Sequence, residues 1–457
     1  MKKYGFCVLG MLFLIAATAM AGGVQDTAAV ESAEFEMWTT QTQSDRVSNI
    51  QLLIDTFTAL NPGIDITLVP VDENDLPAQV AASAAAGTLP ALGEGGSENA
   101  ISFGAEGLLD MDASTAFIKS IGKNRFYQGT LKILESPTRG TYYAVPYHGW
   151  IQGIWYRRDW FADAGFDEPD DWDAIEKAAK HFYQPDKNQY GILVGTKAEV
   201  FSEQVFTQFA ISNNARLFDG EGNLVFNSPR MKEALDYYAQ IAKFNPPGPQ
   251  TWRARDYYMQ GKMAMFFYST YIMDDLALAE VAAGSLTAEN FGDLEGAAFD
   301  ARLVENTAFV PRIRKRQPAS YGVVVAYALY KQDDPDKTAA AGMFLDYLFT
   351  EDAYISYLHM QPGGMNPVLK EIAESEKFLN EPKGIYTRYG SDKITQIVSG
   401  LENIQRFGIV DGNLIEAYGK IFTQQIIPQM IFKITQEGED VQAAMDWAER
   451  EMKKVIQ

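Results

Sequence analysis

The sequence predicts an α/β protein built from two α/β domains. Short apolar segments with strand patterning alternate with amphipathic segments of helical period along most of the chain, an order typical of sheets covered by helices. The 457 residues exceed the usual size of one domain. Beyond the N-terminal region, no stretch reaches the roughly 18 consecutive apolar residues that a membrane-spanning helix needs.

The first predicted domain begins with the order β-α-β-α. Residues 34–39 (EFEMWT) alternate as a strand does, and Ser44 caps a helix that ends at the sequence NPG. Residues 64–71 are a second predicted strand, and residues 76–86 are an alanine-rich second helix. This order predicts a parallel sheet flanked by helices.

The middle of the chain repeats this alternation. Asp170 or Asp171 caps a predicted helix, and Ser228, followed by proline, opens another one. The apolar segments 262–267 (KMAMFF) and 322–328 (GVVVAYA) are predicted to be buried strands. A second α/β domain is therefore expected in this part of the chain.

The N-terminus has the features of a secretory signal peptide. Lys2 and Lys3 precede an apolar run, and the sequence AMA at 19–21 offers a small-residue cleavage site. Residues 1–21 are therefore expected to be removed, which leaves residues 22–33 as a flexible leader. Because two lysines are lost, the net charge changes from −21 to −23. The only cysteine, Cys7, leaves with the signal, so no disulfide and no lipid anchor are expected, and the predicted location is the periplasm.

The strong negative charge argues against nucleic acid as a partner, because its phosphates require a basic surface. Residues 312–316 (RIRKR) form the one basic cluster. Such a run is usually a solvated loop, and a docking patch is the alternative.

The sequence shows no convincing catalytic or metal-binding motif. His148, His181 and His359 are scattered, and neither an HExxH motif nor a phosphate loop ending in GK[ST] is present. No metal, cofactor or enzymatic activity is therefore expected. A periplasmic carbohydrate-active enzyme remains an alternative, because the two carboxylates of a glycosidase cannot be recognised by sequence spacing.

Residues 142–160 (YYAVPYHGWIQGIWYRRDW) are unusually aromatic. Trp and Tyr combine a flat apolar face with a hydrogen-bonding edge, which suits a solvated concave surface and the alternating C–H faces and hydroxyls of a sugar. Packing in the core or at its rim is the alternative, above all for Trp155 and Tyr156. The aromatic residues that fall at predicted strand ends and turns, where α/β proteins bind ligands, are Trp38, Tyr147, Trp150, Trp155, Trp252, Tyr268 and Tyr271.

The order of motifs along the chain resembles that of the bacterial extracellular solute-binding proteins of family 1, the maltose-binding-protein-like sugar-binding components of ABC importers. The resemblance covers nearly the whole mature chain. It rests on EFEMWTT, PGIDITLVPV, VAASAAAGTLPAL, FGAEGLLDMD, the stretch from YAVPYHGW to DWDAIEKAAK, FDGEGNLVFNSPRMKEALDYY, YMQGKMAMFFYSTY, AAGMFLDYLFTEDAYISYL and the C-terminal TQEGEDVQAAMDWAEREMKKVI.

The resemblance implies two α/β lobes, each a mainly parallel sheet flanked by helices, with three interlobe crossings and ligand in the cleft. The implied crossings are residues 145–153, 268–271 and 320–321. The implied boundaries are residues 34–147 and 269–320 for lobe 1, and residues 148–268 and 321–457, with the C-terminal helices, for lobe 2.

The resemblance also implies the ligand contacts. Three positions depart from the maltose-binding pattern: Ala91 replaces an aspartate, Gly95 an aromatic residue and Trp150 an acid. The identity of the sugar therefore stays open. The implied ligand-binding residues are Trp38, Thr40, Gln41, Gln43, Glu98, Asn99, Tyr147, His148, Trp150, Glu203, Gln204, Trp252, Tyr268, Tyr271, Gly363, Gly364 and Met365.

The implied function is capture of a carbohydrate by a monomer that closes around it and delivers it to an inner-membrane ABC permease. A polyol, a glycoside-type osmolyte or another polar solute is the alternative ligand.

Overall fold

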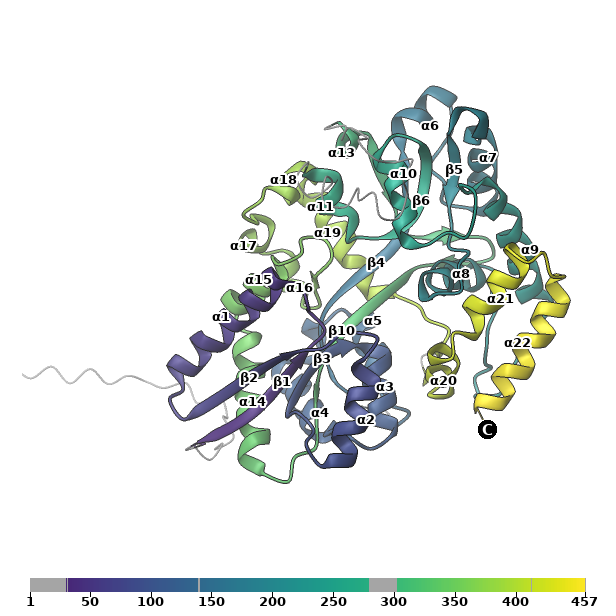
Figure 1. The fold of residues 1–457 in the computed structure, drawn as a ribbon. Helices are drawn as coiled ribbons and strands as arrows, with labels where there is room; N and C mark the ends of the chain where they lie inside the picture. Colours follow the sequence, from purple (N-terminus) through teal and green to yellow (C-terminus); the bar gives the residue numbers. More distant parts are fainter. Residues whose placement is uncertain (1–29, 31, 139, 279–301, 412, 457) are drawn as a thin grey trace, which may run out of the picture.

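The computed structural model describes residues 30, 32–138, 140–278, 302–411 and 413–456. In this part of the chain the elements form two lobes, which share the long strands β4 (Val145–Arg157) and β10 (Tyr321–Leu329) (Figure 1). The predicted signal peptide and most of the predicted leader lie outside the described residues. The α/β, two-lobed class predicted from the sequence is confirmed.

Lobe 1 is built around the N-terminal strands (purple and blue in Figure 1) and is completed by later helices. Its strands are β1 (Ala33–Thr39), β2 (Ile64–Pro70) and β3 (Leu92–Gly96). Its helices are α1 (Ser44–Leu60), α2 (Leu76–Ala86), α3 (Ser97–Ala105), α4 (Met111–Ile121), η1 (Lys123–Arg125), α5 (Gln128–Leu134), α14 (Pro335–Leu348) and α15 (Glu351–Leu358).

Lobe 2 carries the strands β5 (Tyr190–Leu193), β6 (Met263–Ser269), β7 (Thr307–Val310) and the hairpin β8 (Ile313–Arg314) with β9 (Pro318–Ala319). Its helices are α6 (Arg158–Ala164), α7 (Trp172–Phe182), η2 (Pro185–Lys187), α8 (Val200–Ser212), α9 (Pro229–Ile241), η3 (Ala242–Phe244), η4 (Trp252–Arg255), α10 (Asp256–Met259), α11 (Ile272–Ala277), α13 (Leu303–Asn306), α20 (Ala417–Thr423), α21 (Ile426–Thr435) and α22 (Val441–Ile456).

A third group of short elements follows α15 and leads toward lobe 2. It consists of β11 (Asn366–Pro367), α16 (Lys370–Ala373), α17 (Glu376–Leu379), α18 (Ile385–Tyr389), α19 (Ser391–Ser399), η6 (Gly400–Asn403) and the pair β12 (Ile409–Val410) and β13 (Asn413–Leu414).

Local sequence signals account for many of these elements. In α1 the side chains of Ile50, Leu53, Ile54 and Phe57 recur at helical spacing and are all buried against lobe 1. The predicted caps of α7 and α9 are present: Asp171 accepts a hydrogen bond from the amide of Ala174, and Ser228 accepts one from the amide of Met231. Propensity and capping therefore place most elements near their predicted ranges.

One sheet path runs through both lobes in the order β2-β1-β3-β10-β4-β6-β5. Pairing is parallel between β1 and its neighbours β2 and β3, and again between β5 and β6. It is antiparallel on both sides of β4, where β10 pairs with the first part of the strand, and β6 and β7 pair with the last part. The two strands β4 and β10 therefore connect the lobes directly.

The division of the chain between the lobes differs from the predicted boundaries. Residues 307–310, predicted in lobe 1, form β7 and pair with the lobe 2 end of β4. The chain after residue 321, predicted in lobe 2, first forms β10, which pairs with β3, and then α14, which packs on β1. Because these pairings join segments distant in sequence, the strand pattern alone could not reveal them.

The crossings differ as well. β4 is the predicted first crossing, and β10 begins at the predicted third one. Residues 268–271, the predicted second crossing, cover the last two residues of β6 and the two that follow it. The next described elements, α11, α13 and β7, belong to lobe 2 like β6, so this segment does not join the described parts of the two lobes. The third passage is residues 400–408, whose Gln405 amide donates a hydrogen bond to Ser320 O (3.0 Å).

Among the described residues, no helix has the length and apolar composition that a membrane span requires.

Candidate ligand-binding site between the lobes

The central strand β4 separates two environments at the junction of the lobes. Gly149 and Ile151 face the passage 400–404: a Cβ at Gly149 would meet Leu401, and Ile151 lies against Gly400. Trp150 and Gln152 point to the opposite side, because successive side chains of a strand alternate. On that side the Gln152 Nε2 donates a hydrogen bond to Gln204 O (3.0 Å), which ties the strand to α8 of lobe 2.

Trp150 forms an aromatic and charged group with residues of both lobes. Its ring lies 6.1 Å from that of Tyr321, and the guanidinium of Arg406 lies 4.8 Å from the centre of the Tyr321 ring. Arg406 forms an ion pair with Glu98 at the start of α3, and its Nη1 donates to Gly322 O (3.2 Å). Trp150 and Glu98 are both only partly buried. The structure therefore brings two predicted ligand residues together beside the hinge.

Glu203 extends this group into lobe 2. Its side chain is 1% exposed, and its Oε1 accepts a hydrogen bond from the Tyr418 hydroxyl (2.8 Å). Burial raises the pKa of Glu203 to about 7, against the opposing effects of Tyr418 and Arg406. The neighbouring Gln204 is the one position among residues 201–210 that is not fully buried.

In lobe 1, Glu94 at the end of β3 is the centre of a buried hydrogen-bond network. Its carboxylate accepts hydrogen bonds from Thr39 Oγ1 (2.8 Å), Thr40 N (2.8 Å) and Gln41 Nε2 (3.0 Å). The His148 Nε2 lies 3.5 Å from the same carboxylate. Burial raises the pKa of Glu94, but these partners outweigh it and lower the pKa overall. Thr40, Gln41 and His148, predicted as ligand contacts, are therefore held by Glu94 and position the loop after β1.

Trp252 and Tyr268 form a second aromatic pair in lobe 2, with ring centres 6.5 Å apart. Arg255 lies over both rings, donates to the Tyr268 hydroxyl and lies 3.1 Å from the Asp275 carboxylate. Trp252 is partly exposed, whereas Tyr268 is buried. The Trp252 ring is contacted by two guanidinium groups, those of Arg253 (4.4 Å) and Arg255 (4.9 Å).

Tyr271 lies beside the loop at residues 363–365. Carbon atoms of its ring are 2.3–2.4 Å from the position that a Cβ on Gly364 would occupy, so only glycine fits there. The amide of Gly363, whose φ is +83°, donates to the Tyr386 hydroxyl (3.0 Å). The three predicted residues Gly363, Gly364 and Met365 are buried, so this loop supports Tyr271 rather than presenting its own backbone to a ligand.

Several predicted ligand residues are placed elsewhere. Tyr147 is completely buried among Tyr327, Phe349, Tyr354 and Tyr357, and its hydroxyl donates to Leu348 O (3.0 Å). It does not face a cleft, and the prediction for this residue is wrong.

Trp38 is also a core residue, with its indole nitrogen bonded to Glu36 (2.8 Å). Gln43 is the exposed N-cap position of α1, and Asn99 is partly buried in the first turn of α3. Trp155 is buried, as expected for a core strand.

The sequence reasoning missed Glu94, Arg255, Tyr321, Arg406 and Tyr418. Glu94 lies within the short strand β3, which pairs in parallel with β1 and leads directly into α3, but no strand was predicted at these residues. The other residues come from the crossings and from helices distant in sequence, and no local motif marks them.

The arrangement suits recognition of a polar, uncharged molecule. Beside Trp150, the partly buried Glu98 carboxylate can accept hydrogen bonds from hydroxyls, and the partly buried Trp150 ring can stack on C–H faces. Within the described ranges, no group of three or more His, Cys, Asp or Glu side chains could hold a metal ion. The fold and this site define a two-lobed binding protein.

Comparison with known proteins supports this class. Residues 42–355 match the family of bacterial extracellular solute-binding proteins. Because this match covers more than half of the chain, the chain belongs to that family. The members of the family are solute-binding proteins of transport systems, so this protein is a binding protein and not an enzyme.

Similar proteins agree with this assignment. YcjN of Escherichia coli K12, described as a putative ABC transporter periplasmic-binding protein, is 27% identical over 427 residues, which are 93% of each chain. The maltose-bound structure of MalE3 from T. maritima aligns with a TM-score of 0.69 at 16% identity, covering 92% of this chain and 100% of that one. A ribitol-bound solute-binding protein from Agrobacterium radiobacter K84 aligns with a TM-score of 0.69 at 19% identity, covering 93% and 99%.

Proposed function

We propose that this protein captures a carbohydrate between its two lobes and delivers it to the permease of an ABC importer. The single observation that carries the proposal is the group beside Trp150: Glu98 of lobe 1 forms an ion pair with the crossing residue Arg406, which lies over the Tyr321 ring next to Trp150. A ligand held there contacts both lobes, so its binding favours the conformation in which they are closed.

The residue types favour a ligand rich in hydroxyl groups. Glu98 and Gln204 offer oxygen acceptors, and the partly buried rings of Trp150, Trp252 and Tyr271 offer stacking faces. A polyol is the alternative ligand, because one similar structure holds ribitol and another holds maltose. A polyol carries hydroxyls but has no sugar ring. Its binding therefore depends more on the oxygen acceptors of the protein than on the aromatic side chains.

The proposed site of action is the periplasm, with export by the N-terminal signal and cleavage after Ala21. The features that support it are the charged and apolar pattern of residues 1–21 and membership of an extracellular family. The protein is proposed to act as a monomer, with the closed form as the state that the permease recognises.

A thermal-shift screen over monosaccharides, disaccharides and polyols tests the proposal. A ligand at a hundredfold excess over its dissociation constant stabilises the folded state by about 2.7 kcal/mol. We expect a shift of this size for at least one neutral carbohydrate or polyol and none for amino acids. Stabilisation by amino acids alone would contradict the proposal.

A further inference from the structure

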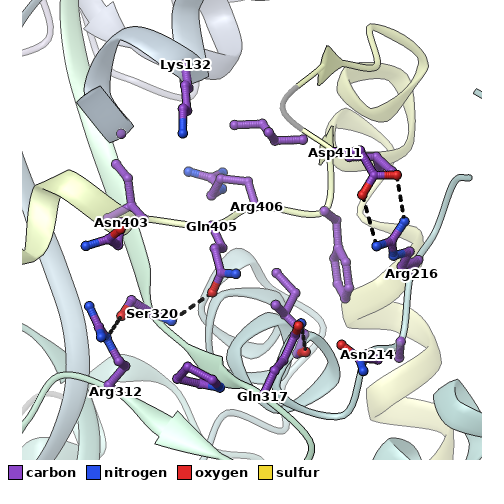
Figure 2. A pocket seen from close by; sticks show the side chains of 18 of the residues that line it. Lys132, Asn214, Arg216, Arg312, Gln317, Ser320, Asn403, Gln405, Arg406 and Asp411 are labelled. Atoms are coloured by element: carbon purple, nitrogen blue, oxygen red, sulfur yellow. Dashed lines mark hydrogen bonds and ion pairs between the residues drawn. The ribbon is translucent and has the colours of Figure 1, made fainter. Parts of the chain in front are cut away.

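A cavity lies between the lobes, on the side of the passage 400–408 (Figure 2). Its volume is about 470 Å³. One wall is α5 of lobe 1, the opposite wall is the end of α8 and the β8–β9 hairpin of lobe 2, and the floor is residues 402–411. None of the predicted ligand residues lines this cavity.

The lining is basic, although the chain as a whole carries a net charge of −21. The charged side chains that line it are Lys132, Arg216, Arg312 and Arg406, with Glu402 and Asp411. Four basic groups against two acidic ones give the lining a formal charge of +2.

Both acidic groups are already engaged by other residues. Asp411 accepts two hydrogen bonds from the Arg216 guanidinium, each of 3.1 Å. Glu402 accepts a hydrogen bond from the amide of Gln128 (2.8 Å), and the Lys370 ammonium lies 3.5 Å from it. Neither carboxylate is therefore free to neutralise the remaining basic side chains.

Lys132 and Arg312 have no carboxylate within ion-pairing distance among the residues that the structure describes. Lys132 reaches into the cavity from α5, and Arg312 approaches it from the start of β8 (Figure 2). The Arg312 Nε donates only to the Ser320 hydroxyl (3.3 Å). The two unneutralised cations thus come from opposite lobes.

Arg312 differs from its neighbours in the basic run 312–316. Arg314 pairs with Asp170 (2.9 Å), Lys315 with Asp173 (3.4 Å) and Arg316 with Glu233 (2.9 Å), all on the surface of lobe 2. This part of the run is the solvated, ion-paired loop that the sequence favours. Arg312 instead lines the cavity.

Neutral hydrogen-bonding groups complete the lining. The amide side chains of Asn214, Asn403 and Gln405 lie around the basic groups (Figure 2). The Gln405 Oε1 accepts a hydrogen bond from Ser320 N (3.2 Å), which leaves its NH₂ group as a donor at the cavity. These amides add hydrogen-bond donors to the basic side chains of the lining.

We propose that this cavity is a second binding site, which takes a small oxyanion: phosphate or the carboxylate of an organic acid. Lys132 from lobe 1 and Arg312 from lobe 2 would each offer charge-assisted hydrogen bonds to an anion in the cavity, and the amides would add further donors. The site adjoins the one at Trp150, because Arg406 lines the cavity and also belongs to the group around Trp150, and it does not depend on which solute that group binds.

Isothermal titration calorimetry with inorganic phosphate and with citrate, at constant ionic strength, tests this site. We expect at least one of the two anions to bind with a dissociation constant in the millimolar range or tighter. The ratio of the two dissociation constants distinguishes a site for phosphate from a site for carboxylates. In the double variant Lys132→Gln/Arg312→Gln, affinity should fall about tenfold for each cation removed.

The matched control is Lys119→Gln/Arg230→Gln, which removes one exposed lysine and one exposed arginine away from the cavity. Its affinity should equal that of the unmodified protein. No binding of either anion, or equal losses in the two double variants, would overturn the proposal. Melting temperatures of all variants, measured without anion, establish that a loss of binding is not a loss of folding.

Discussion

Tyr147 and Trp150 lie on the same strand, β4, and both come from the same aromatic stretch. Tyr147 is enclosed by four aromatic rings of lobe 1, with its hydroxyl bonded to a backbone carbonyl. Trp150 is only partly buried, and its ring neighbours Tyr321 at the junction of the lobes. The same aromatic stretch thus supplies one core residue and one partly exposed residue.

The two residues differ in which side chains pack over them. Tyr354 and Tyr357 on α15, together with Phe349, close over Tyr147 from about 200 residues further along the chain. Trp150 lies beyond the end of this cover, where β10 and Arg406 pass from one lobe to the other. The position along β4 relative to α15 therefore decides whether an aromatic side chain is enclosed in the core or left partly exposed at the junction.

The largest expected effect is on the core residue. Replacing Tyr147 with Ala should lower the free energy of unfolding by about 3–5 kcal/mol, because it leaves a cavity among well-packed rings. Chemical denaturation without ligand measures this change. Tyr147→Phe is the control: it keeps the ring, loses only the bond to Leu348, and should cost about 1 kcal/mol. An unchanged free energy of unfolding in the Tyr147→Ala variant would contradict the assignment of Tyr147 to the core.

The second prediction concerns the buried acid at the junction. Glu203 has a folded-state pKa of about 7, above the ordinary value of 4.5. A raised pKa means that the folded state holds the proton more tightly, so the contribution of Glu203 to stability is present below about pH 4.5 and is lost as pH rises through 7.

Glu203→Gln stays neutral and should therefore be more stable than the unmodified protein above pH 7, by an amount on the order of 3 kcal/mol. The two proteins should converge toward pH 4.5. Denaturation midpoints across this range measure the difference. A constant offset between the two curves at all pH values would show that Glu203 does not titrate there.

The third prediction tests the open side of the comparison. Trp150→Ala should remove most of the roughly 2.7 kcal/mol that a hundredfold excess of ligand contributes, while the ligand-free protein loses little. Melting temperatures with and without the best carbohydrate measure both quantities. Trp150→Phe, which keeps a stacking ring, should retain part of the shift. A large loss in the ligand-free protein with the ligand shift intact would make Trp150 a core residue like Tyr147.

The smallest expected effect is that of salt. A neutral ligand neutralises few formal charges, so its affinity at the Trp150 site should change little between low and moderate salt. Phosphate binding in the basic cavity should weaken over the same range. Titrations of both ligands in the same buffers measure this contrast, and a steep salt dependence of the carbohydrate would indicate a charged solute instead.

The sequence was sufficient for the class of fold and for most elements, because these depend on local signals. The caps at Asp171 and Ser228 and the apolar face of α1 can all be recognised within one turn of a helix. The lobe assignment after residue 268 failed because β7 and β10 find their partners far away in sequence.

The candidate site shows the same limit. The resemblance implied Glu98, Trp150, Glu203, Gln204 and Tyr271 as ligand contacts; of these, Glu98 pairs with Arg406 beside Tyr321 and Trp150, and Gln204 is bonded to β4 through Gln152. The resemblance could not distinguish Tyr147 from Trp150, because the covering helix is not local. It also could not identify Arg406, because no sequence motif marks this residue. Arg406 reaches Glu98 only through the course of the third passage.

A crystal structure of the protein with its best carbohydrate or polyol ligand tests the central claim most directly. We expect the ligand to lie between the lobes in contact with Trp150, with at least one hydrogen bond to a lobe 1 residue such as Glu98 and one to a lobe 2 residue such as Gln204. A ligand bound wholly within one lobe, or in the basic cavity beside Lys132, would contradict it.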